Sequence, residues 1–249
     1  MARVHLRAPR VRVHATLPLP GMALVQPPPS DYERSLCLLD SPEGQLLAAH
    51  IDDSSLQYVV AACDSFEAQI EGSWCALAAI VCACKALSLT SALPEMTQVA
   101  LFQHVTGSTA TSGGLRAGIS LGECEQLLAS LGLRHASESG PATCQIRSVS
   151  ANDANAFAAV LCADLGEVAS GSKLMLVNVL RQVKGIWTGH WMVVAARVTT
   201  NTGDSWALVL DPAAHKLGAH FLPEGTLVAA MCTLNSRGEA RGYVMIESG

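Results

Sequence analysis

The sequence predicts an α+β protein, and two observations support that prediction. Up to residue 171 the apolar residues recur at helical spacing between helix start and stop signals. Beyond residue 171 the apolar segments become short, rich in Val, Ile, Leu and aromatic residues, and separated by turn signals. Helices and strands that are segregated along a chain, rather than alternating, indicate helices packed on an antiparallel sheet.

The composition sets the broad class of protein. Half of the 249 residues are apolar and 15% are charged, which is enough for a sizeable core. The net charge of −5 gives no reason to expect a nucleic acid or an anionic membrane as partner. No apolar run reaches the length of about 18 residues that spans a bilayer. The nine cysteines form no C-x-x-C pair, so we expect reduced thiols and a cytoplasmic protein.

The first 30 residues form a separate region. They carry four arginines within the first twelve positions, no acid, and a Pro-rich end. This composition is typical of an organelle transit peptide, although serine is missing from most of it, and equally of a disordered basic tail. We therefore expect a tail over residues 1–30 and one folded domain over residues 31–249, and import into an organelle stays open.

The folded domain begins with helical signals. A turn and a short amphipathic segment occupy residues 41–51, and residues 54–66 fit either a helix or a strand. Residues 75–89 are apolar on every face except at Lys85, which predicts a helix in the middle of the protein. Residues 94–105 combine a Pro-Glu start signal with helical periodicity.

Two later helices have recognisable ends. Ser120 precedes an amphipathic segment as its N-cap, Glu123 completes a capping box, and Gly132 can end the helix. A further helix is expected over residues 152–168, capped by its initial Asn-Asp pair.

The strand signals follow in the second half. A turn at Asn201-Thr202-Gly203-Asp204 separates the second and third apolar segments, which predicts that these two strands pair as a hairpin. The four expected strands cover residues 173–180, 190–198, 206–211 and 242–248.

Cys75 stands where a nucleophile is expected. The Gly72-Ser73 turn stops just before it, and the buried helix follows directly. A helix N-terminus stabilises a thiolate, because its backbone N–H groups and its dipole favour negative charge. The alternative is a buried apolar thiol that fills the core, which is the commoner role of a cysteine.

His190 and Asp211 are the candidates for the other members of a catalytic triad. His190 opens the second strand and Asp211 closes the third, so the hairpin brings them together at one edge of the sheet. An acid there can hold the imidazole tautomer and stabilise its cation, which in turn stabilises a thiolate. The alternatives are a backbone-bonded strand residue for His190 and a turn residue before Pro212 for Asp211.

Two further expectations concern the reaction itself. Gln69, six residues before Cys75, can donate its side-chain amide to an oxyanion beside the backbone N–H of Cys75. A pair formed by the Cys75 thiolate and the His190 imidazolium predicts a bell-shaped dependence of rate on pH.

Several segments resemble the phytochelatin synthase family, in the family's order. The stretch QIEGSWCALAAIVCACKAL is similar to the family's active-site helix, with a Gln, five residues and then Cys75. The likeness runs from about Ser41 to Glu247 and implies a single catalytic domain without the Cys-rich C-terminal extension of eukaryotic members. The other matching segments are SPEGQLL, GISLGECEQLLASLGL, LMLVNVLRQVKGIWTGHWMVVAAR, LVLDPAAHKLGAHFLP and RGYVMIES.

The resemblance implies a papain-like cysteine protease fold, with a helical N-terminal half whose nucleophile helix packs on the antiparallel sheet. Cys75 would attack the Cys–Gly amide of glutathione, His190 would protonate the departing glycine, and Asp211 would orient His190. The γ-glutamylcysteinyl thioester would then pass to a second glutathione, giving metal-chelating phytochelatin for heavy-metal detoxification, or to water, giving γ-Glu-Cys.

The resemblance also implies the partners of the protein. These are glutathione and related γ-glutamyl peptides, with substrate contacts at Arg241, Asn235 and Gly189, and the family is compatible with a homodimer. It implies no tightly bound cofactor and no metal ligands in the protein. Cd²⁺ and Zn²⁺ ions would act as activators or as metal-thiolate substrate.

The chain departs from the family at several positions. Ala214 stands where the family usually has Arg and Leu217 where it has Tyr, although Lys216 is kept. Asn235 replaces an acid with which the family helps hold the γ-Glu amine of the substrate. The Arg that in the family faces the carboxylate of the same γ-Glu group is kept as Arg241. Loss of one charge-assisted hydrogen bond is worth about 1.5–3 kcal/mol. These departures favour hydrolysis or an altered acyl donor over efficient chain extension.

Two other functions stay open on the sequence alone. A papain-like cysteine peptidase acting on other peptides would use the same triad. A thiol-rich metal-buffering protein without turnover would use the cysteine content, above all Cys82-Ala83-Cys84. Residues two apart on a helix point about 200° from each other, so Cys82 and Cys84 cannot hold one ion together.

Overall fold

The computed structural model describes most of the chain. The described residues are 32–89, 93, 95–107, 118–135, 144–150, 154–169, 173–213 and 215–248. Outside these ranges lie the tail over residues 1–30, residues 108–117, the Asn152-Asp153 pair and Ala214. Within the described ranges, no helix combines the length and apolarity needed to cross a membrane.

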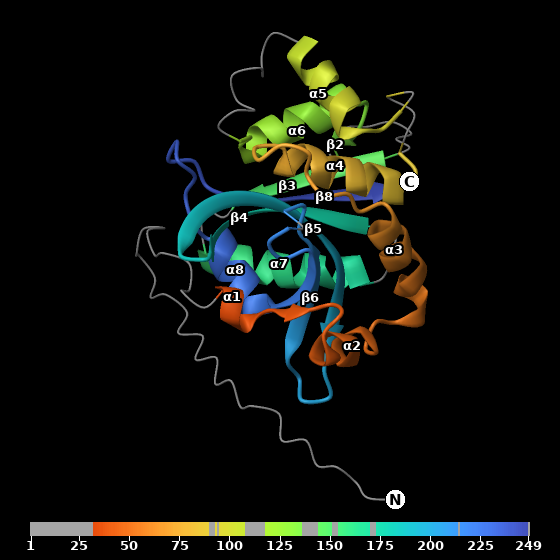
Figure 1. Ribbon diagram of the computed structural model, residues 1–249, viewed down its shortest axis with the longest axis vertical. Helices are drawn as coiled ribbons and strands as arrows, with labels where there is room; N and C mark the ends of the chain where they lie inside the picture. Colours follow the sequence, from red (N-terminus) through yellow and green to blue (C-terminus); the bar gives the residue numbers. More distant parts are fainter. Residues whose placement is uncertain are drawn as a thin grey trace, which may run out of the picture.

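An eight-stranded sheet runs through the molecule (Figure 1). Its strand order is β1-β7-β6-β5-β4-β8-β3-β2, and neighbouring strands are antiparallel except β2 and β3. The α+β class is confirmed, and the four expected strands are present as β4, β5, β6 and β8. The strands are β1 (Cys37–Leu38), β2 (Arg134–His135), β3 (Cys144–Ser150), β4 (Lys173–Val183), β5 (Ile186–Thr199), β6 (Ser205–Leu210), β7 (Ala219–Pro223) and β8 (Gly242–Ser248).

The helices largely follow the sequence signals. Residues 54–66, which fit a helix or a strand, lie mostly in α3. The helix expected over residues 94–105 begins only at Gln98, because the hydroxyl of Thr97 accepts the backbone N–H of Ala100 and caps it there. The helices are α1 (Tyr32–Ser35), α2 (Pro42–Ala48), α3 (Asp53–Asp64), α4 (Cys75–Ala86), α5 (Gln98–Gly107), α6 (Leu121–Ser130), α7 (Ala154–Ala169) and α8 (Glu224–Met231).

Helices cover both faces of the sheet. Figure 1 shows α4, α5 and α6 gathered on one side and α7 and α8 on the other. Alternating residues of β4 serve the two layers, since successive strand side chains point to opposite faces. Leu174 and Leu176 join the core beneath α3–α6, whereas Met175 and Val177 join the core beneath α1, α7 and α8.

Two hairpins that share β5 position the part of the sheet where the site lies. The β5–β6 hairpin that the turn signal predicts is present, with Thr199 paired to Ser205. The β4–β5 hairpin turns at Lys184 and Gly185, which both adopt positive φ, as this tight hairpin turn requires. β5 starts at Ile186, four residues before the predicted start at His190. The prediction missed these first residues because they are largely exposed and lack the apolar alternation that marks a half-buried strand.

Candidate active site

A cleft opens between the start of α4 and the first residues of β5, an inner strand of the sheet. It brings together Gln69, Cys75, Gly189 and His190 from three separate segments of the chain. Lys216 lies on its far wall. The complete lining is Gln69, Gly72, Ser73, Cys75, Gly118, Thr188, Gly189, His190, Ala213 and Lys216.

Cys75 is the first residue of α4, and its sulfur is nearly buried. Trp74 precedes it without a side-chain cap, and its ring stacks on Phe102 with ring centroids 4.6 Å apart. Burial raises the pKa of the Cys75 thiol, and the backbone N–H groups of Trp191, Ala76 and Cys75 itself partly offset that rise. The helix start therefore supplies the anion-stabilising donors that the sequence predicted.

The Trp191 backbone ties the nucleophile to the strand that carries His190. Its N–H group lies against the Cys75 sulfur, and its indole N–H donates to the carbonyl of Ile119 at 2.9 Å. His190 directly precedes Trp191 on β5, and both His190 and Cys75 line the same cleft.

His190 and Asp211 are in contact, as the hairpin predicts. Nε2 of His190 lies 2.6 Å from Oδ1 of Asp211. The same oxygen accepts the backbone N–H of Ala213 at 2.9 Å, so the carboxylate is fixed on two sides. With Nε2 engaged, Nδ1 is the imidazole nitrogen left to serve Cys75.

Arg181 is a residue of the site that the sequence reasoning missed. Its guanidinium is completely buried on β4 and forms an ion pair with Oδ2 of Asp211. Arg181 falls among the alternate residues of β4 that form a buried apolar series, Val177, Val179 and Val183. A charged residue that interrupts a buried apolar face needs a buried partner, and this signal could have identified it.

The pKa shifts of Cys75 and His190 do not favour the expected thiolate–imidazolium pair. Burial lowers the pKa of His190 well below its ordinary value, and the cations Arg181 and Lys216 lower it further. The Asp211 carboxylate is already balanced by Arg181, so its charge cannot fully oppose this fall. Since the pKa of Cys75 rises while that of His190 falls, both groups favour the neutral form.

Gln69 lines the cleft, but its side-chain donors are engaged. Its Nε2 donates to the carbonyls of Glu71 and Gly72 at 2.9 and 2.8 Å. Its buried Oε1 has no hydrogen-bond partner among the described residues. The oxyanion role of Gln69 stays a prediction and requires this amide to turn when substrate binds.

Arg241 lies behind Gly189, close to the nucleophile. A Cβ at Gly189 would lie 2.9 Å from Nη2 of Arg241, so a side chain there would displace the guanidinium from its present position. Nη1 donates to Oδ1 of Asn178. Burial lowers the pKa of Arg241 to about 10, and the charge of Cys75 opposes that shift. Within the described part of the chain no carboxylate pairs with Arg241, so it can receive one from a ligand.

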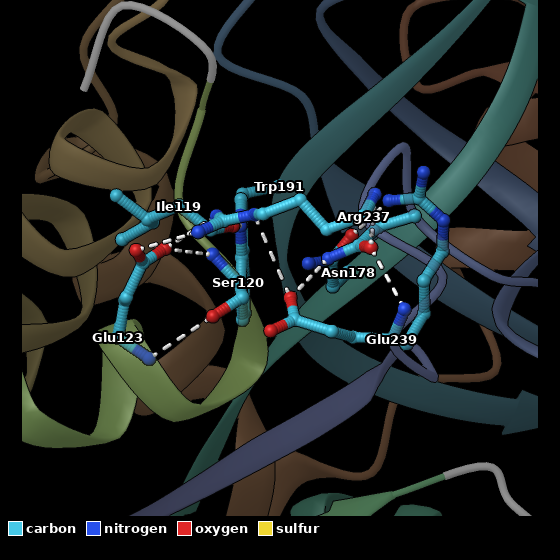
Figure 2. A network of polar contacts seen from close by, with 9 residues as sticks. Ile119, Ser120, Glu123, Asn178, Trp191, Arg237 and Glu239 are labelled. Carbon is cyan, nitrogen blue, oxygen red and sulfur yellow. Dashed lines mark hydrogen bonds and ion pairs between the residues drawn. The ribbon is translucent and has the colours of Figure 1, made fainter. Parts of the chain in front are cut away.

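Asn235 belongs to a tight turn that ends just before β8. Its Oδ1 accepts the backbone N–H groups of Arg237 and Glu239, and its Nδ2 donates to Glu239. Figure 2 shows how Arg237 leaves this turn and meets Glu123 on α6. Within this turn the Oδ1 of Asn235 and one N–H of its amide are engaged.

The remaining cysteines give no sign of a metal centre. Cys82 is buried and its thiol donates to the carbonyl of Ala62 at 3.4 Å. Over the ranges that the structure describes, no three His, Cys, Asp or Glu side chains are grouped to hold a metal ion. Core packing accounts for the position of Cys82.

Comparison with known proteins identifies the family of this chain. A family model described as phytochelatin synthase matches residues 31–243, which is most of the chain. A search of curated proteins finds no match.

Proposed function

The chain belongs to the phytochelatin synthase family of papain-like glutathione γ-glutamylcysteinyltransferases, and from that premise we propose that it cleaves the Cys–Gly amide of glutathione through a thioester on Cys75. The protein is an enzyme of glutathione-based γ-glutamylcysteinyl transfer. The observation that supports the finer proposal is the shared cleft of Cys75 and His190, with Asp211 held 2.6 Å from the imidazole.

In the proposed first step His190 acts as a general base. As the Cys75 sulfur attacks the carbonyl carbon of the Cys–Gly amide, its proton passes to Nδ1 of His190. The imidazolium formed in this step is stabilised by Asp211. The backbone N–H of Cys75 is placed to donate to the oxyanion at the helix start.

The second step releases glycine and leaves the enzyme acylated. His190 gives its proton to the amide nitrogen, the C–N bond breaks, and a γ-glutamylcysteinyl thioester remains on Cys75. Either the amine of a second glutathione or a water molecule then attacks the thioester, with His190 again as the base. The first route gives (γ-Glu-Cys)₂-Gly and the second gives γ-Glu-Cys.

We expect water to be the main acceptor. Leu217 stands where the family has a Tyr, and its side chain packs partly buried against the α7 layer instead of offering a hydroxyl. Lys216 remains on the cleft wall. Ala214, which replaces the family Arg, lies outside the described residues. Cd²⁺ and Zn²⁺ would enter as thiolates of the glutathione substrate.

Product analysis tests the proposal. Purified protein is incubated with glutathione, with and without Cd²⁺ or Zn²⁺, and the products are followed by mass spectrometry. We expect glycine and γ-Glu-Cys to exceed (γ-Glu-Cys)₂-Gly, and Cys75→Ser to abolish both routes.

Cys82→Ser is the matched control. It alters a buried thiol on the same helix, outside the cleft, so turnover should persist while stability falls slightly. Turnover that survives Cys75→Ser would remove the proposed nucleophile.

A further inference from the structure

The γ-glutamyl head of glutathione carries two opposite charges, but the cleft described so far has a partner for only one. Arg241 lies behind Gly189 of the cleft lining, where its guanidinium can take the α-carboxylate. The residues that line the cleft include Lys216 but neither Asp nor Glu. An ammonium that leaves water without an acceptor is costly to bind, so a carboxylate close to Arg241 is needed for selective recognition.

Asn235 cannot fill this role without breaking its turn. Its Oδ1 already accepts two backbone N–H groups, at 2.8 Å from Arg237 and 3.0 Å from Glu239. Its Nδ2 is a donor and so repels an ammonium. The side chain stabilises the turn and holds its neighbours in place.

Glu239 lies two residues before Arg241 on an extended segment. Ala240, between them, forms an antiparallel bridge with Leu234, and the backbone N–H of Arg241 donates to the carbonyl of Thr233. In extended backbone, residues two apart project to the same side. Glu239 and Arg241 therefore form an acid and a base on one side of the segment that leads into β8.

The carboxylate of Glu239 is oriented but not neutralised. Its Oε2 accepts from Nδ2 of Asn235 at 2.7 Å, and Nε of Arg237 lies 3.6 Å away. The terminal nitrogens of Arg237 bond instead to both carboxylate oxygens of Glu123, at 2.8 and 2.6 Å. Oε1 of Glu239 accepts no hydrogen bond from another described residue, and the side chain is half exposed.

The contacts in Figure 2 connect Glu239 to the cleft wall. Arg237 reaches from the turn to Glu123, with the Glu239 carboxylate beside it. Glu123 in turn accepts the backbone N–H of Ser120 at 2.7 Å, two residues after Gly118 of the cleft lining. These contacts link Glu239, through Arg237 and Glu123, to the segment that contains Gly118, and Arg241 follows Glu239 by two residues along the chain.

We propose that Glu239 determines specificity by binding the ammonium of the γ-glutamyl head while Arg241 binds its α-carboxylate. Asn235 acts as the positioning residue for Glu239. This inference rests on the proposed function. It also explains an Asn at position 235, because an Asp there would repel Glu239 and could not donate to it.

Equilibrium binding to the Cys75→Ala protein tests the inference without turnover. The probes are glutathione and glutaryl-cysteinyl-glycine, which lacks only the amino group. We expect the Cys75→Ala protein to prefer glutathione. Adding Glu239→Gln should weaken glutathione binding about 10- to 100-fold, the equivalent of one charge-assisted hydrogen bond, and leave the des-amino probe unchanged.

Two further variants sharpen the result. Glu43→Gln, at an exposed position on α2, is the matched control and should change neither affinity. Asn235→Asp should weaken glutathione selectively, because it removes the donor that orients Glu239. Tighter glutathione binding in Asn235→Asp would show that position 235, not Glu239, meets the ammonium.

The outcomes separate this inference from the proposed function. If Glu239→Gln leaves glutathione affinity unchanged, or weakens both probes equally, the role of Glu239 is wrong and the thioester chemistry is unaffected. If the Cys75→Ala protein binds no glutathione and the wild-type protein turns none over, the proposed function itself fails.

Discussion

Burial lowers the pKa of His190, and the cations Arg181 and Lys216 lower it further. Asp211 divides its carboxylate between His190 and Arg181, so it orients the imidazole without making the imidazolium the favoured form. The thiol of Cys75 is buried as well, and its backbone donors only partly offset the cost of ionisation. Substrate would therefore meet a neutral thiol and a neutral base.

The pH dependence of alkylation distinguishes the neutral pair from an ion pair. With a raised pKa, Cys75 should react slowly with iodoacetamide near pH 6, and its rate should still be rising at pH 9.0, the ordinary pKa of a thiol, instead of levelling off there. The rate is measured on the Cys75 peptide by mass spectrometry, because Cys162 is exposed and also reacts. Rapid alkylation of Cys75 that is constant between pH 5 and 7 would establish the thiolate–imidazolium pair instead.

At the level of elements, the start of α6 stabilises one wall of the cleft. The capping box that the sequence predicts is present, with Ser120 accepting the backbone N–H of Glu123 and Glu123 accepting that of Ser120. Hydrogen bonds from Arg237 lower the pKa of Glu123 to about 2, which burial opposes. The Glu123 side chain supplies both the reciprocal half of the capping box and the ion pair, so one substitution removes these two contacts while the Ser120 hydroxyl still caps the helix.

Glu123→Ala should reduce the free energy of unfolding by about 1–2 kcal/mol, mostly through the lost carboxylate bond to the Ser120 N–H, since the exposed part of the Arg237 pair contributes little. Urea unfolding at pH 7 measures the change. The lowered pKa means that the ionised Glu123 contributes above about pH 4.5, and its contribution is lost as the pH falls toward 2. Ser120→Ala should lose about 1 kcal/mol while keeping the pair. Unchanged stability in Glu123→Ala would show that neither the carboxylate bond to the Ser120 N–H nor the Arg237 pair stabilises this helix start.

For the molecule as a whole, burial of polar groups beneath the sheet determines its response to acid. His220 is completely buried, its Nδ1 lies 2.9 Å from the carbonyl of Gly218, and burial lowers its pKa to about 4. The pKa of His190 is lowered in the same direction. Below pH 6.5 the unfolded chain binds protons at these histidines that the folded protein excludes, so stability falls as the pH decreases.

The expected loss is up to about 1.4 kcal/mol per pH unit for each histidine between pH 6.5 and the folded pKa. Urea unfolding at intervals from pH 7 to 4 measures it. His220→Asn keeps a donor for the Gly218 carbonyl and should flatten the slope. An equal slope in the His220→Asn protein would exclude His220 as a source of acid sensitivity.

The sequence by itself determined the features that depend on local pattern and chain order. Periodicity and turn signals predicted α+β, the buried α4 and the four main strands, and the Ser120–Glu123 pattern predicted the start of α6. The order of strands in a hairpin was sufficient to predict the contact between His190 and Asp211. β7 and α8 were missed, since a five-residue strand followed directly by a short helix gives neither periodicity room to repeat.

Only the tertiary structure decided the contacts and the protonation of the site residues. β4 lies between β5 and β8, and this placement brings Arg181 onto Asp211 and Arg241 onto Gly189. It also showed the donors of Gln69 engaged and the Glu239 carboxylate half free. Protonation and ligand recognition depend on desolvation and on every charge packed nearby, and those quantities are properties of the assembled fold that spacing along a chain does not encode.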